Sequence, residues 1–146
     1  MKWLSSTIII FSVLEGFSMS CLAKSNEQTR NILVTGSTSG LGREVARSLV
    51  DAGDHVIIHG RNKERGEALV AQLNAKRAGS ARFFAADFSS LSQVHSLAES
   101  IAKHYDHLDV LVNNASTFYS TPIEKIALED WENLFGTNLK APLFLS

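Results

Sequence analysis

Four short apolar runs, each followed by a stretch with helical spacing, set the strongest limit on the fold. The runs are apolar throughout instead of alternating with polar residues, which is typical of parallel strands covered on both faces. They occupy residues 32–34, 56–58, 82–86 and 110–112. The spacing of apolar residues predicts helices over 41–52, 63–78, 91–105 and 129–146. Strands that alternate with helices imply right-handed crossovers. The sequence therefore predicts the α/β class, with a Rossmann-type doubly wound parallel sheet.

The composition suits a single globular domain and excludes several kinds of partner. The 146 residues are 45% hydrophobic and 20% charged, as in ordinary soluble domains. A formal net charge of -1 provides no basic field for nucleic acid or for an anionic membrane. The single cysteine, Cys21, excludes an intramolecular disulfide and argues against a cysteine-based metal site, so we expect no metal.

Residues 1–25 differ from the rest and are interpreted as a leader, which leaves residues 26–146 as the folded domain. Lys2, the apolar run 3–14 and the small residues after it have the order of a secretory signal peptide. The run is shorter than the roughly 20 residues that span a bilayer, so no transmembrane span is expected. The alternative is a misassigned start, with the protein beginning at Met19.

The strongest local signal is a glycine-rich segment between the first strand and the first helix, with the spacing TGxxxGxG. Gly36 lets the chain leave the strand in a tight turn, Gly40 lets the backbone approach a pyrophosphate, and Gly42 permits close packing of the helix. The helix N-terminus adds free N–H groups and the positive end of its dipole. The predicted phosphate-binding loop comprises Gly36, Ser37, Thr38, Ser39, Gly40, Leu41 and Gly42. The alternative is a glycine-rich turn without a ligand.

The end of the second strand indicates which nicotinamide cofactor the chain prefers. An acid at this end accepts a hydrogen bond from the ribose 2′-OH of NAD, whereas an arginine accommodates the 2′-phosphate of NADP. Gly60 stands where an acid would be, and Arg61 and Asn62 follow it. Arg61 can donate charge-assisted, bidentate hydrogen bonds to a phosphate. We therefore expect NADP(H) as the cofactor and a partial NADP-binding Rossmann domain over 26–146. The alternative is an arginine that only faces solvent.

Two further motifs complete a resemblance to a known family. Asp87 follows the third strand, and Asn113, Asn114 and Ala115 follow the fourth. Together with TGSTSGLG, they resemble the short-chain dehydrogenase/reductase family over residues 31–146. The resemblance implies an NADP(H)-dependent oxidoreductase that transfers hydride from NADPH to a carbonyl or imine. It also implies a small-molecule substrate and a homo-oligomer for the full-length family member.

The resemblance implies roles for individual residues in cofactor binding. Asp87 would accept a hydrogen bond from the adenine amino group, with Phe88 beside the ring, although Asp87 could instead cap the following helix. Asn113 and Asn114 would steady the sheet, and Ala115 would line the cofactor channel. The alternative for the two asparagines is plain turn chemistry at a strand end.

A narrower resemblance concerns the segment Asn-Ala-Ser-x-Phe-Tyr-x-Thr-Pro at 114–122, which is similar to the pteridine reductase branch. By that match, Ser116 would bind close to the nicotinamide and the substrate, and Phe118 would stack on a flat substrate. Gly40 departs from the branch, whose protozoan members carry an arginine there. The alternative is that Phe118 only packs within its loop.

In the family, proton transfer depends on a serine, a tyrosine and a lysine four residues after the tyrosine. Neither Tyr105 nor Tyr119 has a lysine four residues later. Asn138 matches the family's helix asparagine, which would be catalytic by helping to hold a water in the proton relay, unless it only makes a local hydrogen bond. We therefore expect the N-terminal part of the family fold, truncated after the fourth strand and the following helix and inactive as given. The alternatives are a non-catalytic nucleotide-binding module and an interaction protein.

The predicted cofactor also bears on where the protein works. NADPH is supplied in the cytosol, which favours a cytoplasmic protein that starts at Met19. If residues 1–23 were a true signal peptide, the protein would instead be exported.

Overall fold

The fold is a parallel four-stranded sheet, seen in a computed structural model that describes residues 29–146. The strands are β1 (Asn31–Val34), β2 (His55–Gly60), β3 (Ala81–Ala85) and β4 (Val110–Val112). Their order in the sheet is β3-β2-β1-β4, which confirms the predicted Rossmann-type arrangement. Val34 of β1 lies in register with Ile58 on one side and with Val112 on the other. The predicted leader and the alternative start at Met19 lie outside the described residues.

The helices follow the predicted order, with small differences at their ends. They are α2 (Gly40–Asp51), α3 (Lys63–Lys76), α4 (Leu91–Ala102), the 3₁₀ turn η1 (Ile123–Lys125), α5 (Leu128–Phe135), the π-helical segment η2 (Gly136–Lys140) and α6 (Ala141–Leu145). Helix α3 ends two residues earlier than predicted, because Arg77 adopts an extended conformation. The single helix expected over 129–146 is interrupted by the π-helical segment. No helix in the described part combines the length and apolar character needed to cross a membrane.

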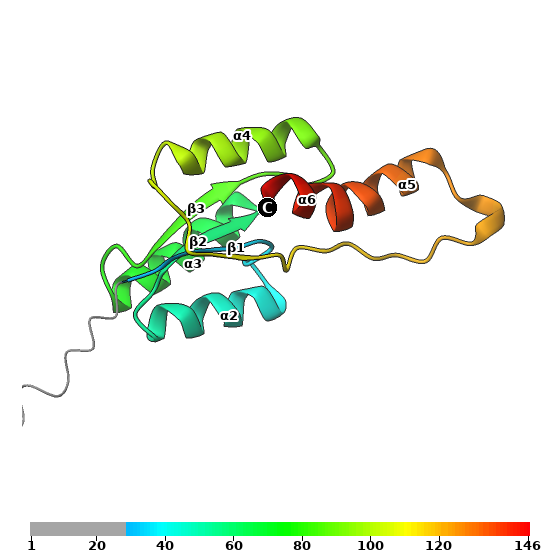
Figure 1. The fold of residues 1–146 in the computed structure, drawn as a ribbon. Helices are drawn as coiled ribbons and strands as arrows, with labels where there is room; N and C mark the ends of the chain where they lie inside the picture. Colours follow the sequence, from blue (N-terminus) through cyan, green and yellow to red (C-terminus); the bar gives the residue numbers. More distant parts are fainter. Residues whose placement is uncertain (1–28) are drawn as a thin grey trace, which may run out of the picture.

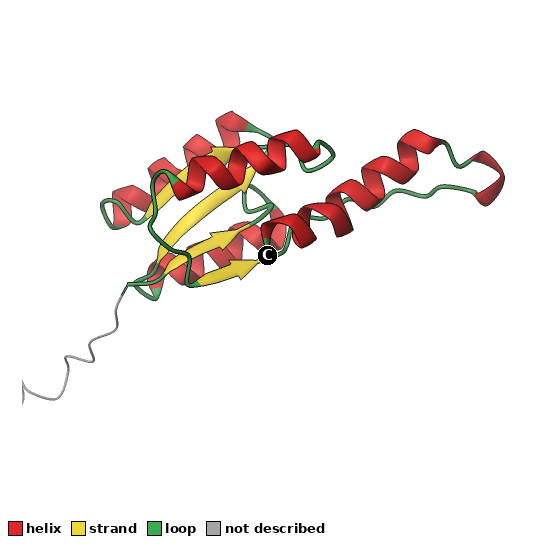
Figure 2. Cartoon of the chain, turned by 45° about the horizontal axis from the view of Figure 1, so that its top comes forward, coloured by secondary structure: helices red, strands yellow, loops and turns green. Residues whose placement is uncertain are grey.

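Two hydrophobic layers cover the sheet (Figures 1 and 2). Helices α2 and α3 pack on one face, where Val50 and Leu69 meet the strand residues Ile32 and Ile58. Helices α4 and α6 pack on the other face, and the core there includes Ile57. Strands β1 and β2 are therefore buried on both sides, as their continuous apolar sequences predicted.

The segment between β4 and α6 extends away from the body as an arm (Figures 1 and 2). Within it, the loop after β4 runs outward and α5 returns toward the body, and the Tyr119 hydroxyl donates to the carbonyl oxygen of Asp130 at 3.4 Å. The rings of Trp131 and Phe135 stack with centroids 3.9 Å apart. The first contact joins the two limbs of the arm, and the second lies within α5.

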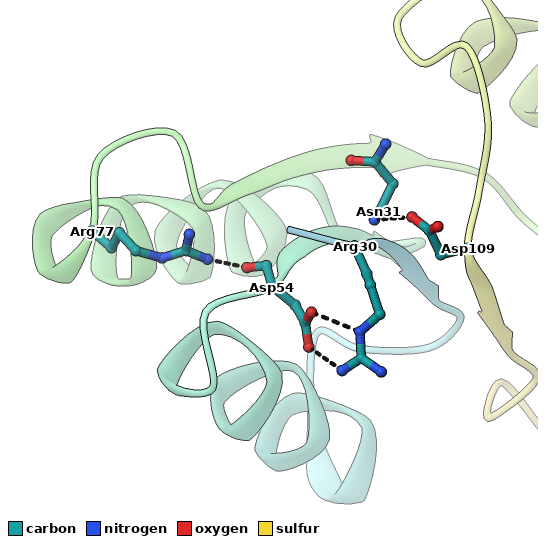
Figure 3. Close-up of polar contacts among 5 residues, drawn as sticks. All are labelled: Arg30, Asn31, Asp54, Arg77 and Asp109. Carbon is teal, nitrogen blue, oxygen red and sulfur yellow. Dashed lines mark hydrogen bonds and ion pairs between the residues drawn. The ribbon is translucent and has the colours of Figure 1, made fainter. Parts of the chain in front are cut away.

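The amino ends of the strands are joined by ionic and hydrogen bonds (Figure 3). Asp54, which precedes β2, accepts two hydrogen bonds from the Arg30 guanidinium at 2.9 and 2.7 Å. Arg77, at the end of α3, donates to the carbonyl oxygen of Asp54. The backbone N–H of Asn31 donates to Asp109 at 2.7 Å. We call these five residues the amino-end cluster.

Candidate functional site

A cavity of about 270 Å³ lies at the opposite, carboxyl end of the sheet. Segments that follow all four strands meet there, as does the start of η2. Its lining consists of Gly36, Thr38, Ser39, Leu41, Gly42, His59, Gly60, Arg61, Ala86, Asp87, Phe88, Asn114, Ala115, Ser116, Thr117 and Thr137. Ligands of doubly wound sheets bind at this end, because the connecting loops diverge there.

Two glycines of the loop after β1 occupy positions that no larger residue fits. Gly36 has a φ of +65°, and a Cβ there would lie 2.8 Å from the Cα of Ala115. A Cβ on Gly42 would lie 2.4 Å from the Asn114 side-chain nitrogen. The predicted close packing at Gly42 is therefore present, although its partner is the segment after β4. Gly40 differs, because only its φ of +55° requires glycine, and it does not line the cavity.

The start of α2 offers backbone donors to this cavity. Ser39 is the N-cap residue, and its side chain makes no capping hydrogen bond. Among the described residues, the N–H groups of Leu41 and Gly42 also find no partner within the protein. Unsatisfied N–H groups at the positive end of a helix dipole attract anions such as phosphate.

Ser37 does not face the cavity, although the sequence placed it in the phosphate-binding loop. Its side chain is fully buried, and its Oγ accepts a hydrogen bond from the backbone N–H of His59 at 3.0 Å. Its own N–H donates to the His59 carbonyl oxygen at 2.8 Å. Ser37 therefore anchors the loop to β2.

The end of β2 places a cation on the cavity wall. Arg61 lines the cavity and makes no hydrogen bond or ion pair with other described residues. A Cβ at Gly60 would lie 2.7 Å from the Thr38 side chain, so a larger residue there would require Thr38 to shift. Asn62 lies outside the lining and caps α3, where its Oδ1 accepts from the Arg65 N–H at 2.8 Å.

The segment after β3 contributes a carboxylate. Asp87 accepts hydrogen bonds from the N–H and the hydroxyl of Ser89 at 3.0 and 2.9 Å. The backbone hydrogen bond from Ser89 is the main reason why the pKa of Asp87 lies below its ordinary value, and the nearby Arg61 charge adds to it. Asp87 is therefore ionised at neutral pH. These contacts belong to the turn before α4 and do not cap that helix, because its N-cap residue is Ser90 and no side chain makes a capping hydrogen bond there.

Phe88 lines the cavity, but it is largely covered by the core. The resemblance put it beside an adenine ring, yet its side chain is only 4% exposed. Its ring stacks on the imidazole of His59, with centroids 4.1 Å apart. Phe88 therefore reaches the cavity as part of the core beneath it, because this end of β3 faces α4 and α6.

The segment after β4 brings some predicted residues to the cavity and leaves others outside it. Ala115 and Ser116 line the cavity, whereas Asn113 is exposed and lies outside it. The Asn114 side chain donates to the carbonyl oxygens of Thr35 and Gly36 at 2.9 and 3.3 Å. Of the two adjacent asparagines, Asn114 therefore ties the segment after β4 to the glycine loop.

Asn138 and Phe118 both lie outside the cavity lining. Asn138 belongs to η2, and its side chain accepts from the Thr117 N–H at 2.9 Å and donates to the Thr117 carbonyl oxygen at 2.8 Å. Asn138 therefore holds the backbone of Thr117, which lines the cavity. Segments of π-helix such as η2 are frequent at functional sites. Phe118 is 92% exposed, so nothing packs on the face that was expected to stack on substrate.

The sequence did not single out four of the residues that line the cavity. These are His59, Ala86, Thr117 and Thr137. A histidine at the end of a fully apolar strand was a usable signal for the first of them, because a buried polar side chain needs partners. Thr137 gave no such signal, since it reaches the cavity only through the return of the arm to the body.

The cavity combines N–H donors, one free cation and one carboxylate. The described residues contain no group of three or more His, Cys, Asp or Glu arranged to hold a metal ion. Such a lining suits a ligand that carries phosphate at one point and a hydrogen-bond donor at another.

Comparisons with known proteins agree with this geometry. Residues 30–146 match the family model described as short chain dehydrogenase. The short chain dehydrogenase/reductase dpchG of Colletotrichum higginsianum is 41% identical over 118 residues, which cover 80% of this chain and 44% of the relative. The D-threitol dehydrogenase of Mycolicibacterium smegmatis is 34% identical over 113 residues, or 77% of this chain and 43% of the relative.

A solved structure supports both the fold and the family. The crystal structure of a metagenomic short-chain oxidoreductase in complex with NADP superposes with a TM-score of 0.73 at 31% identity. The match covers 80% of this chain and 52% of that one. The chain thus spans about half the length of the proteins that it matches. From the family model, the identities and the shared fold, this chain belongs to the short-chain dehydrogenase/reductase family.

Proposed function

We propose that this chain binds NADP(H) in the cavity at the carboxyl end of the sheet. We further propose that the protein is an oxidoreductase that transfers hydride from NADPH to a carbonyl or imine of a small molecule. The observation that carries the proposal is that most of the glycine loop, Arg61 and Asp87 line the same cavity. Bound NADPH supplies the hydride, and the chain's residues bind and orient the cofactor. Membership of an oxidoreductase family favours this function over a non-catalytic nucleotide-binding module or an interaction protein.

The phosphates would lie against the glycine loop and the start of α2. The N–H groups of Leu41 and Gly42 have no partner in the described part of the protein, and the Thr38 and Ser39 side chains line the same wall. Gly36 and Gly42 keep this wall close to the segment after β4, since a Cβ on either would collide with it. The fit of the cofactor thus rests on backbone groups that need no rearrangement to receive an anion.

Arg61 would bind the 2′-phosphate that distinguishes NADP from NAD. Its guanidinium makes no hydrogen bond or ion pair with a described carboxylate, although its charge acts on Asp87, so its N–H groups are available for bidentate hydrogen bonds. Gly60 and Thr38 support the same preference, because the Thr38 side chain fills the space that an acidic residue at position 60 would need. An acid there would otherwise accept from the 2′-OH of NAD.

Asp87 would accept a hydrogen bond from the adenine amino group. Its pKa lies below the ordinary value, chiefly through the Ser89 N–H, so the carboxylate stays an acceptor at neutral pH. Ser89 contacts one carboxylate oxygen, Oδ1, and the other has no hydrogen-bond partner among the described residues. That oxygen is the one we assign to adenine.

The nicotinamide would lie beside Ala115 and Ser116, which line the cavity after β4. Asn138 would act on this end through Thr117, whose N–H and carbonyl oxygen both bond to its side chain. A role for Asn138 in holding a relay water stays part of the proposal. It rests on the match of GTNLKAP to the family's helix asparagine.

A pteridine-type substrate is the narrower proposal. It is supported by the match of residues 114–122 to the pteridine reductase branch and by Ser116, which lines the cavity. Phe118 lies outside the cavity, so stacking would require the arm to move. Quenching of Trp131 fluorescence by a dihydropterin in the presence of NADP would support this substrate class. Unchanged fluorescence would restrict the proposal to carbonyls and imines in general.

We also propose that the protein works in the cytoplasm and that the full-length family member forms a homo-oligomer. Both follow from the family resemblance, the first through the cytosolic supply of NADPH. N-terminal sequencing of the protein from its native cells checks the first, since a mature end near Lys24 would mean export. Sedimentation of the same material checks the second.

The test of the proposed cofactor is a titration of the full chain with NADPH and with NADH, followed by nucleotide fluorescence. We expect NADPH to bind at least about tenfold more tightly, because a charged hydrogen bond contributes about 1.5–3 kcal/mol. Arg61→Ala should remove this preference and leave NADH affinity unchanged. Arg65→Ala is the matched control, because Arg65 is an exposed arginine on α3 outside the cavity. Equal losses for both nucleotides, or no binding of either, would contradict the proposal.

A further inference from the structure

His59 is a buried titratable residue that the proposed function does not use. It lies near the end of β2, and its side chain is 2% exposed. Its neighbours along the strand, Ile57 and Ile58, are completely buried and apolar. A polar ring at such a position is costly unless both of its nitrogens have partners. The position of those partners shows what the ring can do.

The two ring nitrogens contact two different segments. Nδ1 lies 3.2 Å from the backbone nitrogen of Gly36, and Nε2 lies 3.2 Å from the carbonyl oxygen of Ala86. A backbone N–H can only donate and a carbonyl oxygen can only accept. Nδ1 must therefore accept and Nε2 must carry the hydrogen, which assigns one neutral tautomer from the network. The ring thus links the loop after β1 to the segment after β3.

The surroundings of the ring hold it in this orientation. The backbone of His59 exchanges two hydrogen bonds with Ser37, from its N–H to the Ser37 Oγ at 3.0 Å and from the Ser37 N–H to its carbonyl oxygen at 2.8 Å. The Phe88 ring stacks on the imidazole at an interplanar angle of 18°. The side chain and backbone of one residue therefore hold two successive residues of the glycine loop.

We propose that His59 is a positioning residue that fixes the Gly36 peptide of the phosphate-binding loop before the cofactor arrives. The inference rests on the proposed function for the identity of the cofactor. Gly36 has a left-handed φ of +65° and lies against Ala115, so its peptide has few alternatives once its N–H is held. With that N–H committed to the imidazole, the donors left for phosphate are those farther along, at the start of α2.

Two isosteric substitutions separate the two ring contacts. The oxygen of asparagine reaches the position of Nδ1 and can accept from Gly36, so His59→Asn keeps the proposed contact. The amide of glutamine reaches the position of Nε2 and can donate to Ala86, so His59→Gln keeps the other contact and loses the acceptor for Gly36. His59→Phe removes both. A purely structural role would rank the three variants by thermal stability alone.

The first measurement uses the unliganded full chain, labelled with ¹⁵N. We expect a nitrogen–nitrogen coupling across the hydrogen bond between the Gly36 N–H and Nδ1, with the ring proton on Nε2. We expect Gly36 amide exchange to accelerate at least about tenfold in His59→Phe and in His59→Gln, and to stay within about threefold in His59→Asn. No coupling, or a proton on Nδ1, would overturn the proposal without requiring any variant to fold.

The second measurement is NADPH affinity of the same proteins, with melting temperatures recorded alongside. We expect His59→Phe and His59→Gln to bind at least about tenfold more weakly, and His59→Asn to recover to within about threefold of the parent. Affinities that follow melting temperature across the three variants would overturn the positioning role. If the parent chain bound no NADPH, the proposed function would fail, whereas the Gly36 measurements would still decide the role of His59.

Discussion

The two ends of the sheet are built from the same four strands, but they differ in whether their polar groups have partners within the protein. At the carboxyl end, Arg61 makes no ion pair with other described residues, and the N–H groups of Leu41 and Gly42 have no partner there. At the amino end, Asp54 is bound by Arg30 and by Arg77 (Figure 3). Donors at the carboxyl end thus have no partner among the described residues, whereas most polar groups of the amino-end cluster bond to one another, with the buried Nε of Arg77 as an exception.

Helix polarity explains which end does which. In a parallel sheet with crossover helices, α2, α3 and α4 all begin near the carboxyl end and finish near the amino end (Figure 1). Helix N-termini attract anions, and helix C-termini attract cations. Arg77 follows the last residue of α3, and Lys76 reaches Asp51 at the end of α2 at 3.1 Å. Arginine and lysine side chains therefore bind carboxylate and carbonyl oxygens at the amino end, whereas the helix N-termini at the carboxyl end suit an anion.

The largest contrast is expected from two glycine substitutions with the same backbone strain. Gly36 at the carboxyl end and Gly79 near the amino end have φ values of +65° and +71°. A Cβ at Gly36 meets Ala115 at 2.8 Å, whereas a Cβ at Gly79 meets nothing within 4 Å. Gly36→Ala should cost about 4 kcal/mol and abolish NADPH binding, because strain and overpacking add. Gly79→Ala should cost about 1 kcal/mol and leave binding unchanged.

Urea unfolding and NADPH titration of both variants check this contrast. Because the strain is common to both, the difference between the two free energies isolates the close approach of Gly36 to Ala115. Equal destabilisation of the two variants would mean that the glycine loop is not held against the segment after β4.

The next largest effect concerns the pH dependence of stability. Burial lowers the pKa of His59 to about 4, although the Ala86 carbonyl oxygen and the charge of Asp87 oppose the shift. Between pH 6.5 and about 4, the unfolded chain takes up a proton that the folded chain refuses. The free energy of unfolding should therefore decrease as the pH falls through this window, by about 3 kcal/mol.

The amino end should respond in a different pH range. The Arg30 hydrogen bonds are the main reason why the pKa of Asp54 lies below 3.8, so its contribution is lost only as the pH falls below that value. Urea unfolding at pH 7, 5.5 and 4 separates the two ends. His59→Asn should flatten the profile, and Asp54→Asn should not. His55→Gln is a further control, because burial also lowers the pKa of His55. If the free energy of unfolding of His59→Asn still fell steeply between pH 7 and 4, the claim that folded His59 is neutral in this range would be refuted.

A smaller effect is expected from Asp54→Asn at neutral pH. The substitution keeps the shape but removes the charge between Arg30 and Arg77, so we expect a loss of about 2 kcal/mol of stability. NADPH affinity should stay unchanged, because no residue of the amino-end cluster lines the cavity. Thermal melting and the NADPH titration measure the two quantities on one sample. A parallel loss of affinity would show that the two ends are coupled.

The smallest effects are expected from two exposed apolar side chains. Leu41 is 74% exposed and lines the cavity, whereas Phe118 is 92% exposed and does not. Leu41→Ala should weaken NADPH binding about threefold, and Phe118→Ala should change neither binding nor stability by more than about 0.5 kcal/mol. Fluorescence titration distinguishes them. A loss of NADPH affinity on removal of Phe118 would mean that the arm folds over the cavity.

The sequence predicted the parts of the site that are formed by residues close together in the chain. The loop from Gly36 to Gly42 and the position of Arg61 follow from a strand, a turn and a helix start that are local in the chain. The continuous apolar runs predicted a parallel sheet buried on both faces, and the observed order β3-β2-β1-β4 agrees with the predicted Rossmann-type arrangement. These features need no knowledge of distant contacts.

The remaining parts depend on distant contacts and on which side of a strand end a residue falls. Asn113 and Asn114 are adjacent, yet one is exposed and the other bonds to the glycine loop. Phe88 lines the cavity, but its ring also belongs to the core on the α4 face and stacks on His59, which the sequence did not indicate. The alternation of side chains along a strand does not predict which way a side chain points once the strand has ended.

The most direct test of the contrast between the two ends is a ¹⁵N–¹H titration of the full chain with NADPH. We expect shifted amide signals in the loop from Gly36 to Gly42 and at Arg61 and Asp87, with the signals of Asn31 and Asp54 unmoved. This result would place the ligand at the end of the sheet whose donors have no partner in the described protein. Shifts centred on the amino-end cluster, or no shifts at all, would contradict the account.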